Sequence, residues 1–187
     1  MKEIQDNCGV YGIYSTSPCV VDIYSGMDFI QHRGQEYCGI ATFDDHVHQV
    51  THHGKVGNAF TDQDIQYLTG NWGIGHVSLF ERQPMLWQSK LGEISVAFSG
   101  NVMNADELIG KMKRRGQAFY RNYHIELIAK IIMEAKDFVS GLAELAEKIQ
   151  GAYSLVALTA EGVYAARDIY GFRPLILGKD EDRKSVV

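Results

Sequence analysis

The stretch Cys8–Ser15, CGVYGIYS, decides the fold that we predict for this chain. Successive residues of such a stretch fall on opposite faces of a β-strand. Gly9 and Gly12 carry no side chains, so we expect the backbone of this strand to pack closely against a neighbouring segment. Cys8 opens the strand and is the first side chain to consider for chemistry.

Further elements follow outward from this strand. Apolar residues at helical spacing predict helices over residues 21–33, 105–115, 125–132 and 138–149, with a short helix after Thr61. Short apolar runs predict strands over residues 38–43, 48–53, 72–79, 93–98, 153–159, 162–167 and 175–177. Because strands lie at both ends of the chain and helices cluster in the middle, we predict a layered α+β fold.

Composition restricts the class of protein. The chain has 187 residues, of which 45% are hydrophobic and 22% charged, and this suits one globular domain with its own core. The formal net charge of −5 argues against nucleic acid as a partner, and no apolar run is long enough for a membrane span. The N-terminus has no signal-peptide core, and three cysteines without metal-ligand spacing predict a reduced, cytoplasmic location.

Four short motifs could carry chemistry, and each also has a structural interpretation. They are CGVYGI (8–13), QHRGQE (31–36), SGN with NADEL (99–101 and 104–108), and RD with YGFRPL (167–168 and 170–175). Taken alone, Cys8 is a small buried hydrophobe, and Arg33 with Gly34 is a helix end with glycine in a left-handed turn. Asn104 with Glu107 is equally a capping box, and the last motif is a structural β-turn.

The order of these motifs resembles the glutaminase half of the amidophosphoribosyltransferase family, which acts in purine synthesis. The matching sequences are QHRGQE, GIGHV, GNVMNADEL, GAYSLVALT and ARDIYGFRPLILGK. That half is a class II glutamine amidotransferase of the N-terminal-nucleophile hydrolase type. The resemblance implies a four-layer αββα sandwich with the nucleophile on a central strand. It also implies that residues 1–7 are a leader and that residues 8–187 form a single glutaminase-like domain, which ends inside a family strand and lacks the phosphoribosyltransferase half.

The resemblance further implies a mechanism. Removal of the leader makes Cys8 the first residue, and its α-amine, with a pKa of about 7.7–8.0, serves as general base for the thiol. An asparagine side chain and the N–H of Gly100 hold the oxyanion that forms when the thiolate attacks the amide. Arg33 and Gly34 fall among the substrate-binding residues. The resemblance implies no cofactor and no metal.

Three positions depart from the family in residues that contact the substrate. Ser99 stands where the oxyanion asparagine is expected, Ser78 where an arginine binds the glutamine carboxylate, and His124 where an aspartate binds the glutamine amine. Losing one oxyanion donor costs on the order of 100–1,000-fold in rate. Arg82, in a loop shorter than the family's, is a displaced candidate for the missing arginine. We therefore expect little or no glutamine hydrolysis.

The sequence leaves three functions open. The first is a degenerate domain with a binding or regulatory role, or a relic. The second is a working amidase that uses Cys8 on another amide after removal of the leader. The third is a glutaminase that supplies ammonia to a separate synthase. The partners expected are a small amide or amino acid, a separate synthase or a second copy of the chain, without nucleic acid or membrane.

Several histidines lie around a predicted hairpin turn. Asp44 and Asp45 form the turn, and His46 and His48 share one face of the strand that follows. Spacing alone indicates no cysteine or carboxylate cluster that would complete a metal shell. We therefore predict a solvent-exposed strand here, and no metal site.

Overall fold

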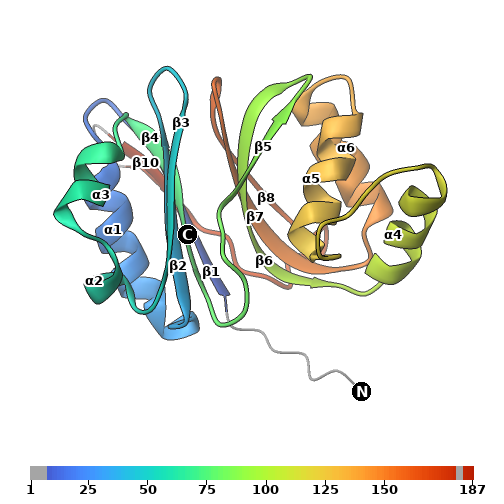
Figure 1. The fold of residues 1–187 in the computed structure, drawn as a ribbon, viewed down its shortest axis with the longest axis horizontal. Coiled ribbons are helices and arrows are strands. Elements are labelled where there is room, and N and C mark those ends of the chain that lie inside the picture. Colours follow the sequence, from blue (N-terminus) through green and yellow to red (C-terminus); the bar gives the residue numbers. More distant parts are fainter. Residues whose placement is uncertain (1–7, 180–182) are drawn as a thin grey trace.

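The computed structural model describes residues 8–179 and 183–187 of the chain. The helices are α1 (Val20–Ile30), α2 (Val56–Ala59), α3 (Asp62–Tyr67), α4 (Ala105–Arg114), α5 (His124–Glu134) and α6 (Phe138–Lys148), with a 3₁₀ turn η1 (Gln31–Arg33). The strands are β1 (Cys8–Ser15), β2 (Tyr37–Phe43), β3 (Val47–His53), β4 (Trp72–Ser78), β5 (Met85–Ser89), β6 (Gly92–Val102), β7 (Gly151–Thr159), β8 (Gly162–Arg167), β9 (Leu177–Lys179) and β10 (Arg183–Val186). Figure 1 shows two sheets face to face, with α1–α3 outside one and α4–α6 outside the other. The predicted αββα sandwich is confirmed.

Strand β1 lies inside the first sheet, whose order is β3-β2-β4-β1-β10-β9. It pairs antiparallel with β4, so that Cys8 lies opposite Ser78 and Tyr14 lies opposite Trp72. The second sheet has the order β5-β6-β7-β8, and in it Ser99 lies opposite Ser154. Cys8 is thus the first residue of a strand paired on both sides, as the sequence predicts.

Three groups of buried apolar side chains hold the four layers together. One lies between the two sheets and includes Val10, Ile74 and Val156. The other two lie between each sheet and its helices. The close packing predicted for the glycines of β1 is confirmed at Gly9, because a Cβ there would lie 2.9 Å from the Cδ1 of Ile30.

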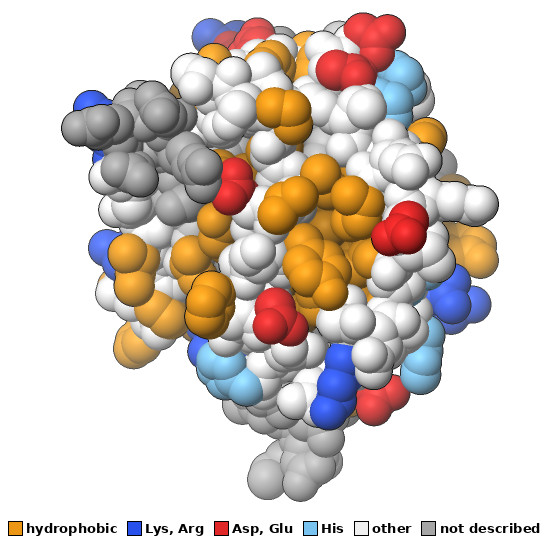
Figure 2. All heavy atoms as spheres, turned by 90° about the vertical axis from the view of Figure 1, so that its left-hand side faces the viewer, with side chains coloured by type: hydrophobic (Ala, Val, Ile, Leu, Met, Phe, Trp, Pro, Cys, Tyr) orange, Lys and Arg blue, Asp and Glu red, His pale blue; other side chains and the backbone are white. Residues whose placement is uncertain are grey.

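The outer face formed by α1–α3 is partly apolar. Figure 2 shows hydrophobic side chains at the centre of this face and acidic side chains around them. On these elements Tyr24 packs edge-on against Phe60, with ring centroids 6.1 Å apart, while Val21 and Phe29 are exposed. No helix among the described residues is both long and apolar enough to cross a membrane.

Most predicted elements are confirmed, but strand limits near the chain end differ. The last predicted strand, over residues 175–177, is found instead as β9, which begins at Leu177. Its position is set by pairing with β10, in which Val186 lies opposite Leu177. Strand β5, Met85–Ser89, was not predicted at all, and it forms by pairing with the first half of β6.

Two predicted local motifs are wrong. Asn104 makes no side-chain cap for α4; its Nδ2 donates to the Lys148 carbonyl at 2.9 Å and its Oδ1 accepts from the Gln150 N–H at 3.0 Å. Gly34 does not adopt a left-handed conformation, since its φ is −175°. A glycine is needed there because a Cβ would lie 2.5 Å from the Cα of Ser78.

Candidate active site

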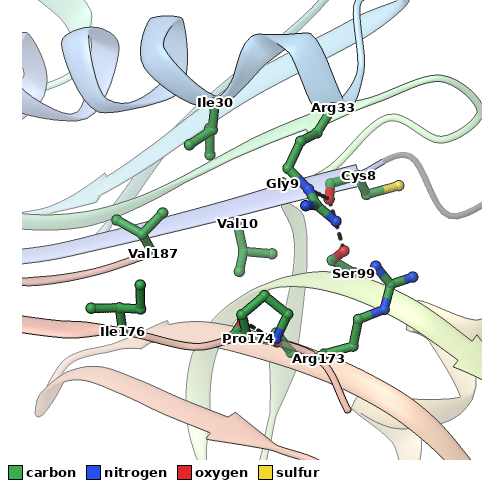
Figure 3. Close-up of a pocket in the computed structure, with 11 residues that line it drawn as sticks. Cys8, Gly9, Val10, Ile30, Arg33, Ser99, Arg173, Pro174, Ile176 and Val187 are labelled. Carbon is green, nitrogen blue, oxygen red and sulfur yellow. Dashed lines mark hydrogen bonds between the residues drawn. The ribbon is translucent and has the colours of Figure 1, made fainter. Parts of the chain in front are cut away.

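A small cavity of about 110 Å³ lies beside the first three residues of β1 and extends between the two sheets. It is lined by Cys8, Gly9, Val10, Ile30, Arg33, Ser99, Ser154, Arg173, Pro174, Ile176 and Val187. In Figure 3 the polar groups of Cys8, Arg33, Ser99 and Arg173 gather at one end of this cavity. The apolar side chains of Val10, Ile176 and Val187 lie at the other end. The cavity is therefore polar beside the nucleophile position and apolar away from it.

The backbone carbonyl of Cys8 is held from two sides. The Nε of Arg33 donates to it at 3.0 Å, and the Oγ of Ser99 donates to it at 2.9 Å. Arg33 ends the turn η1 that follows α1, whereas Ser99 belongs to β6 of the other sheet. The structure thus brings together three of the residues that the sequence singled out, and it commits the Ser99 hydroxyl proton to the backbone of Cys8.

The Cys8 thiol points away from the apolar end of the cavity (Figure 3) and contacts Ser78. Its Sγ lies 3.5 Å from the Ser78 Oγ, which also accepts the backbone N–H groups of Phe80 and Glu81 at 3.0 and 3.1 Å. Burial raises the pKa of the Cys8 thiol above its ordinary value of 9.0; the Ser78 bond opposes this shift, and the nearby Glu81 carboxylate adds to it. The thiol is therefore held in its neutral, weakly nucleophilic form.

Ser78 acts here as the anchor of a turn. It is fully buried, and its hydroxyl organises the first residues of the short loop after β4. The backbone of Ser78 packs directly against Gly34, which explains why position 34 needs a glycine. Gly34 thus acts through Ser78 and is not among the residues that line the cavity.

Gly100 has a backbone conformation that favours glycine. Its φ is +153°, and a Cβ would lie 2.2 Å from the carbonyl oxygen of Ala152 on β7. It follows Ser99 on β6 and therefore lies close to the cavity without lining it. The glycine retained from the family motif has a structural reason of its own.

His124 and Arg82 lie apart from the cavity lining. His124 begins α5, where its Nδ1 accepts the Val102 N–H at 3.4 Å and its ring packs edge-on against Phe98. The Arg82 guanidinium lies 5.9 Å from the ring centre of Tyr37. Neither His124 nor Arg82 is therefore among the residues that line this cavity, and a substrate-binding role at either position stays a prediction.

The segment after β8 supplies cavity residues that the sequence did not assign to the site. Asp168 is buried, which would raise its pKa, but N–H bonds from Arg173, Phe172, Tyr153 and Tyr170 outweigh burial and lower it. This carboxylate therefore folds residues 168–174 into a fixed turn. The turn places Arg173 and Pro174 in the cavity, and the RD…YGFRPL motif was the signal that could have located them.

One further cluster lies at the other end of the first sheet. Among the described residues, Asp44, Asp45, His46 and His48 form a group that could hold a metal ion. The sequence spacing had not indicated that carboxylates would join the two histidines.

A cysteine that opens a central strand of an αββα sandwich defines the class of N-terminal-nucleophile hydrolases. A protein-family model described as a glutamine amidotransferase domain matches residues 76–187. The chain therefore belongs to the class II glutamine amidotransferase domain family, in its amidophosphoribosyltransferase-like branch.

Similar proteins support this assignment. The amidophosphoribosyltransferase of Methanocaldococcus jannaschii is 35% identical over 189 residues, which cover 93% of this chain and 40% of that protein. The one from Archaeoglobus fulgidus is also 35% identical, over 94% of this chain and 41% of that protein. The solved structure of the glutamine phosphoribosylpyrophosphate (PRPP) amidotransferase from B. subtilis, complexed with ADP and GMP, aligns with a TM-score of 0.89 at 27% identity, over 95% of this chain and 41% of that one. The chain thus spans about two fifths of the length of these relatives.

Proposed function

We propose that this chain is a glutaminase-like domain with little or no glutamine hydrolysis, which has a binding or regulatory role in an amidophosphoribosyltransferase system of purine synthesis. One observation carries this proposal: Ser99 and Ser78, at two substrate-contacting positions of the family, both bond to Cys8 itself. A hydroxyl that donates to the Cys8 carbonyl has no second proton to give to an oxyanion. The site thus has neither a side-chain donor for the oxyanion at position 99 nor a cation for the glutamine carboxylate at position 78.

The state of the thiol supports the same proposal. A cysteine nucleophile acts as the thiolate, and enzymes of this kind lower its pKa with a base or a cation. Here burial and the Glu81 carboxylate raise the Cys8 pKa. A neighbouring carboxylate would also repel the carboxylate of bound glutamine.

The second candidate is an amidase that uses Cys8 on a non-glutamine amide once the leader is removed. The apolar end of the cavity, lined by Val10, Ile176 and Val187, favours this candidate. It matches a small apolar acyl group better than the charged end of an amino acid. The leader, residues 1–7, lies outside the described residues.

Exposed apolar side chains lie on the segment that contributes residues to the cavity. The segment after β8 exposes Ile169, Tyr170 and Phe172, each with more than two thirds of its surface accessible, and Leu177 follows on β9. Exposed apolar residues grouped on one segment are typical of protein interfaces. We propose a separate synthase or a second copy of the chain as the partner, and a cytoplasmic location in view of the free thiols at Cys8, Cys19 and Cys38.

The test compares the full chain with a variant in which a start methionine, removed in the cell, directly precedes Cys8. Intact mass establishes the first residue of each preparation, and glutamate release is then measured at millimolar glutamine. We expect no release dependent on Cys8 in either protein, with Cys8→Ala as the control. Turnover above about 1 s⁻¹ in the processed variant, abolished by Cys8→Ala, would overturn the proposal. Hydrolysis of small apolar amides but not glutamine would support the second candidate instead.

A further inference from the structure

The turn between β2 and β3 gathers two imidazoles and two carboxylates. The Nδ1 of His46 lies 2.6 Å from the Asp45 Oδ1, and the Nε2 of His48 lies 3.0 Å from the Asp44 Oδ1. The Nδ1 of His46 and the Oδ1 of Asp44 are 4.0 Å apart, and one ligand atom from each of the four residues lies within 4.8 Å of all the others. Acidic and histidine side chains stand side by side at the upper edge of Figure 2, the edge at which Figure 1 places this turn.

The hairpin itself produces this arrangement. Phe43 pairs with Val47 at the end of the β2–β3 ladder, so residues 44–46 make a tight turn. His46 and His48 are two residues apart and therefore project to the same side. Their rings come together with centroids 4.0 Å apart. The register of the hairpin thus holds two nitrogen ligands on one side of the turn.

Asp44 is fixed in place by one group from outside the hairpin and one group within its turn. The Thr69 hydroxyl, which follows α3, donates to its Oδ2 at 2.5 Å, and the Asp45 N–H donates to its Oδ1 at 2.5 Å. Metal-binding carboxylates in proteins are commonly oriented by such a second layer of hydrogen bonds. The most central carboxylate of the group is therefore already oriented toward His48.

His48 is the buried member of the group. Its residue surface is only 8% exposed, and Tyr67 packs edge-on against its ring. One ring nitrogen faces Asp44, while the buried Nδ1 has no hydrogen-bond partner among the described residues. The Nε2 is therefore the ring nitrogen that His48 offers to the group, and burial of the ring holds it beside Asp44.

We propose that Asp44, Asp45, His46 and His48 bind a divalent transition-metal ion of the zinc type. Two imidazole nitrogens and two carboxylate oxygens are ligands that such ions accept, and their bond lengths of about 2.0–2.2 Å place neighbouring ligand atoms roughly 3.3 Å apart in a tetrahedral site. The spacings of 2.6 to 4.0 Å bracket that value. Asp45 and His46 are exposed, so small rotations of their side chains complete the shell.

This site is separate from the candidate active site. Cys8 and Tyr37 both align with Ser78 at one end of β4, whereas Phe43, just before the turn, aligns with Trp72 at the other. Six residues of strand separate the two ends, which corresponds to roughly 20 Å. The metal would brace the hairpin against the Thr69 segment and would take no part in chemistry at Cys8.

The test is a zinc titration of the full, tag-free chain in competition with a chromophoric chelator. We expect one Zn²⁺ per chain, and a rise in melting temperature when zinc is added. His46→Ala and Asp45→Asn, both at exposed side chains, should weaken binding by about 10–100-fold or more. The matched control is His53→Ala, which removes an exposed histidine of the same strand that faces Glu36 at 3.2 Å and should leave binding unchanged.

Cobalt substitution gives a second readout. Co²⁺ bound by this mixed set should show the intense visible absorption of a four-coordinate site, without the sulfur charge-transfer band that a cysteine site would give. Absence of stoichiometric zinc binding would overturn the proposal. Equal affinities of the native chain and His46→Ala would overturn it as well, because the zinc would then lie elsewhere.

Discussion

At the scale of single residues, Gly34 connects the helix layer to β4, the strand beside the one that carries Cys8. A Cβ at this position would lie 2.5–2.6 Å from three backbone atoms of Ser78, the residue that contacts the Cys8 thiol. Gly34→Ala should therefore lower the free energy of unfolding by about 1–3 kcal/mol, because backbone must shift to relieve the overlap. Chemical denaturation of the purified variant measures this change.

The control for Gly34 is Gly57→Ala. Gly57 lies in the short helix α2, and a Cβ there would meet nothing closer than the Tyr24 hydroxyl at 3.9 Å. Alanine is the better helix former, so this variant should be as stable as the native chain or slightly more stable. If both substitutions lower the free energy of unfolding equally, the close approach of Gly34 to Ser78 is not the reason that position 34 requires glycine.

The raised pKa of Cys8 predicts its reactivity. Burial is the main cause, and Glu81 contributes repulsion of the thiolate. Alkylation by iodoacetamide, followed by mass spectrometry, should increase with pH up to a midpoint above 9.0. Glu81→Gln should lower that midpoint and speed alkylation at a given pH. A midpoint below 9.0 in the native chain would contradict this account of the thiol.

Cys19 and Cys38 provide internal references in the same experiment. Burial raises their pKa values to about 12 and about 11, and neither residue is more than 1% exposed. Both should stay unmodified while Cys8 reacts. Their modification at the rate of Cys8 would indicate that the alkylation reports unfolding of the chain.

At the scale of elements, Asn104 connects α4 to the end of α6. Its amide donates to the Lys148 carbonyl and its side-chain oxygen accepts the Gln150 N–H. Asn104→Asp loses the donor and sets a carboxylate against a carbonyl, so we expect a loss of about 1 kcal/mol in the free energy of unfolding. A plain N-cap would tolerate this change, because asparagine and aspartate cap helices about equally well.

Asp137→Asn is the matched comparison. The Asp137 Oδ1 accepts the Ser140 N–H at 2.7 Å, so this residue is a true N-cap of α6. Asp137→Asn should therefore leave the free energy of unfolding, measured by chemical denaturation, nearly unchanged. Equal effects at the two positions would mean that Asn104 acts as a cap after all.

The difference between these two positions explains what the sequence could predict. Local patterns sufficed where the partner lies within a few residues, as in the short helix predicted after Thr61, which the structure confirms as α3 with Thr61 as its N-cap and Asp64 as its partner. Alternation and helical spacing likewise located β1 and α5. The partners of Asn104 are 44 and 46 residues away, so no local pattern could reveal them.

The candidate site follows the same rule. Cys8 and Ser99 were found because short motifs surround them, but their hydrogen bond spans 91 residues and depends on how the two sheets meet. The metal cluster needed Thr69 to orient Asp44, which hairpin spacing does not indicate. Residue roles therefore came from motifs, while residue contacts required the assembled sandwich.

At the scale of the whole molecule, His76 joins the two sheets. It is fully buried on β4, and its Nε2 lies 3.1 Å from the Phe98 carbonyl on β6 of the other sheet. Its Nδ1 has no partner among the described residues. Desolvation lowers the pKa of His76 from 6.5 to about 4, against the smaller opposite effect of the Phe98 bond. The folded chain therefore keeps this imidazole neutral at pH values where the unfolded chain protonates it.

This difference predicts how stability depends on pH. The contribution of a neutral His76 is complete above pH 6.5 and is lost progressively as the pH falls toward about 4, because the unfolded state then binds a proton that the folded state does not. Between pH 7 and pH 5 the loss should be about 2 kcal/mol. His76→Gln, which keeps an N–H donor for Phe98, should be less stable at pH 7 but should lose less on acidification. Denaturant unfolding of both proteins at pH 7 and pH 5 measures the slope of the free energy of unfolding against pH for each protein. The difference between the two slopes separates the effect of His76 from that of the exposed histidines. Equal slopes would mean that His76 takes up its proton in the folded state, and that water reaches the interface between the sheets.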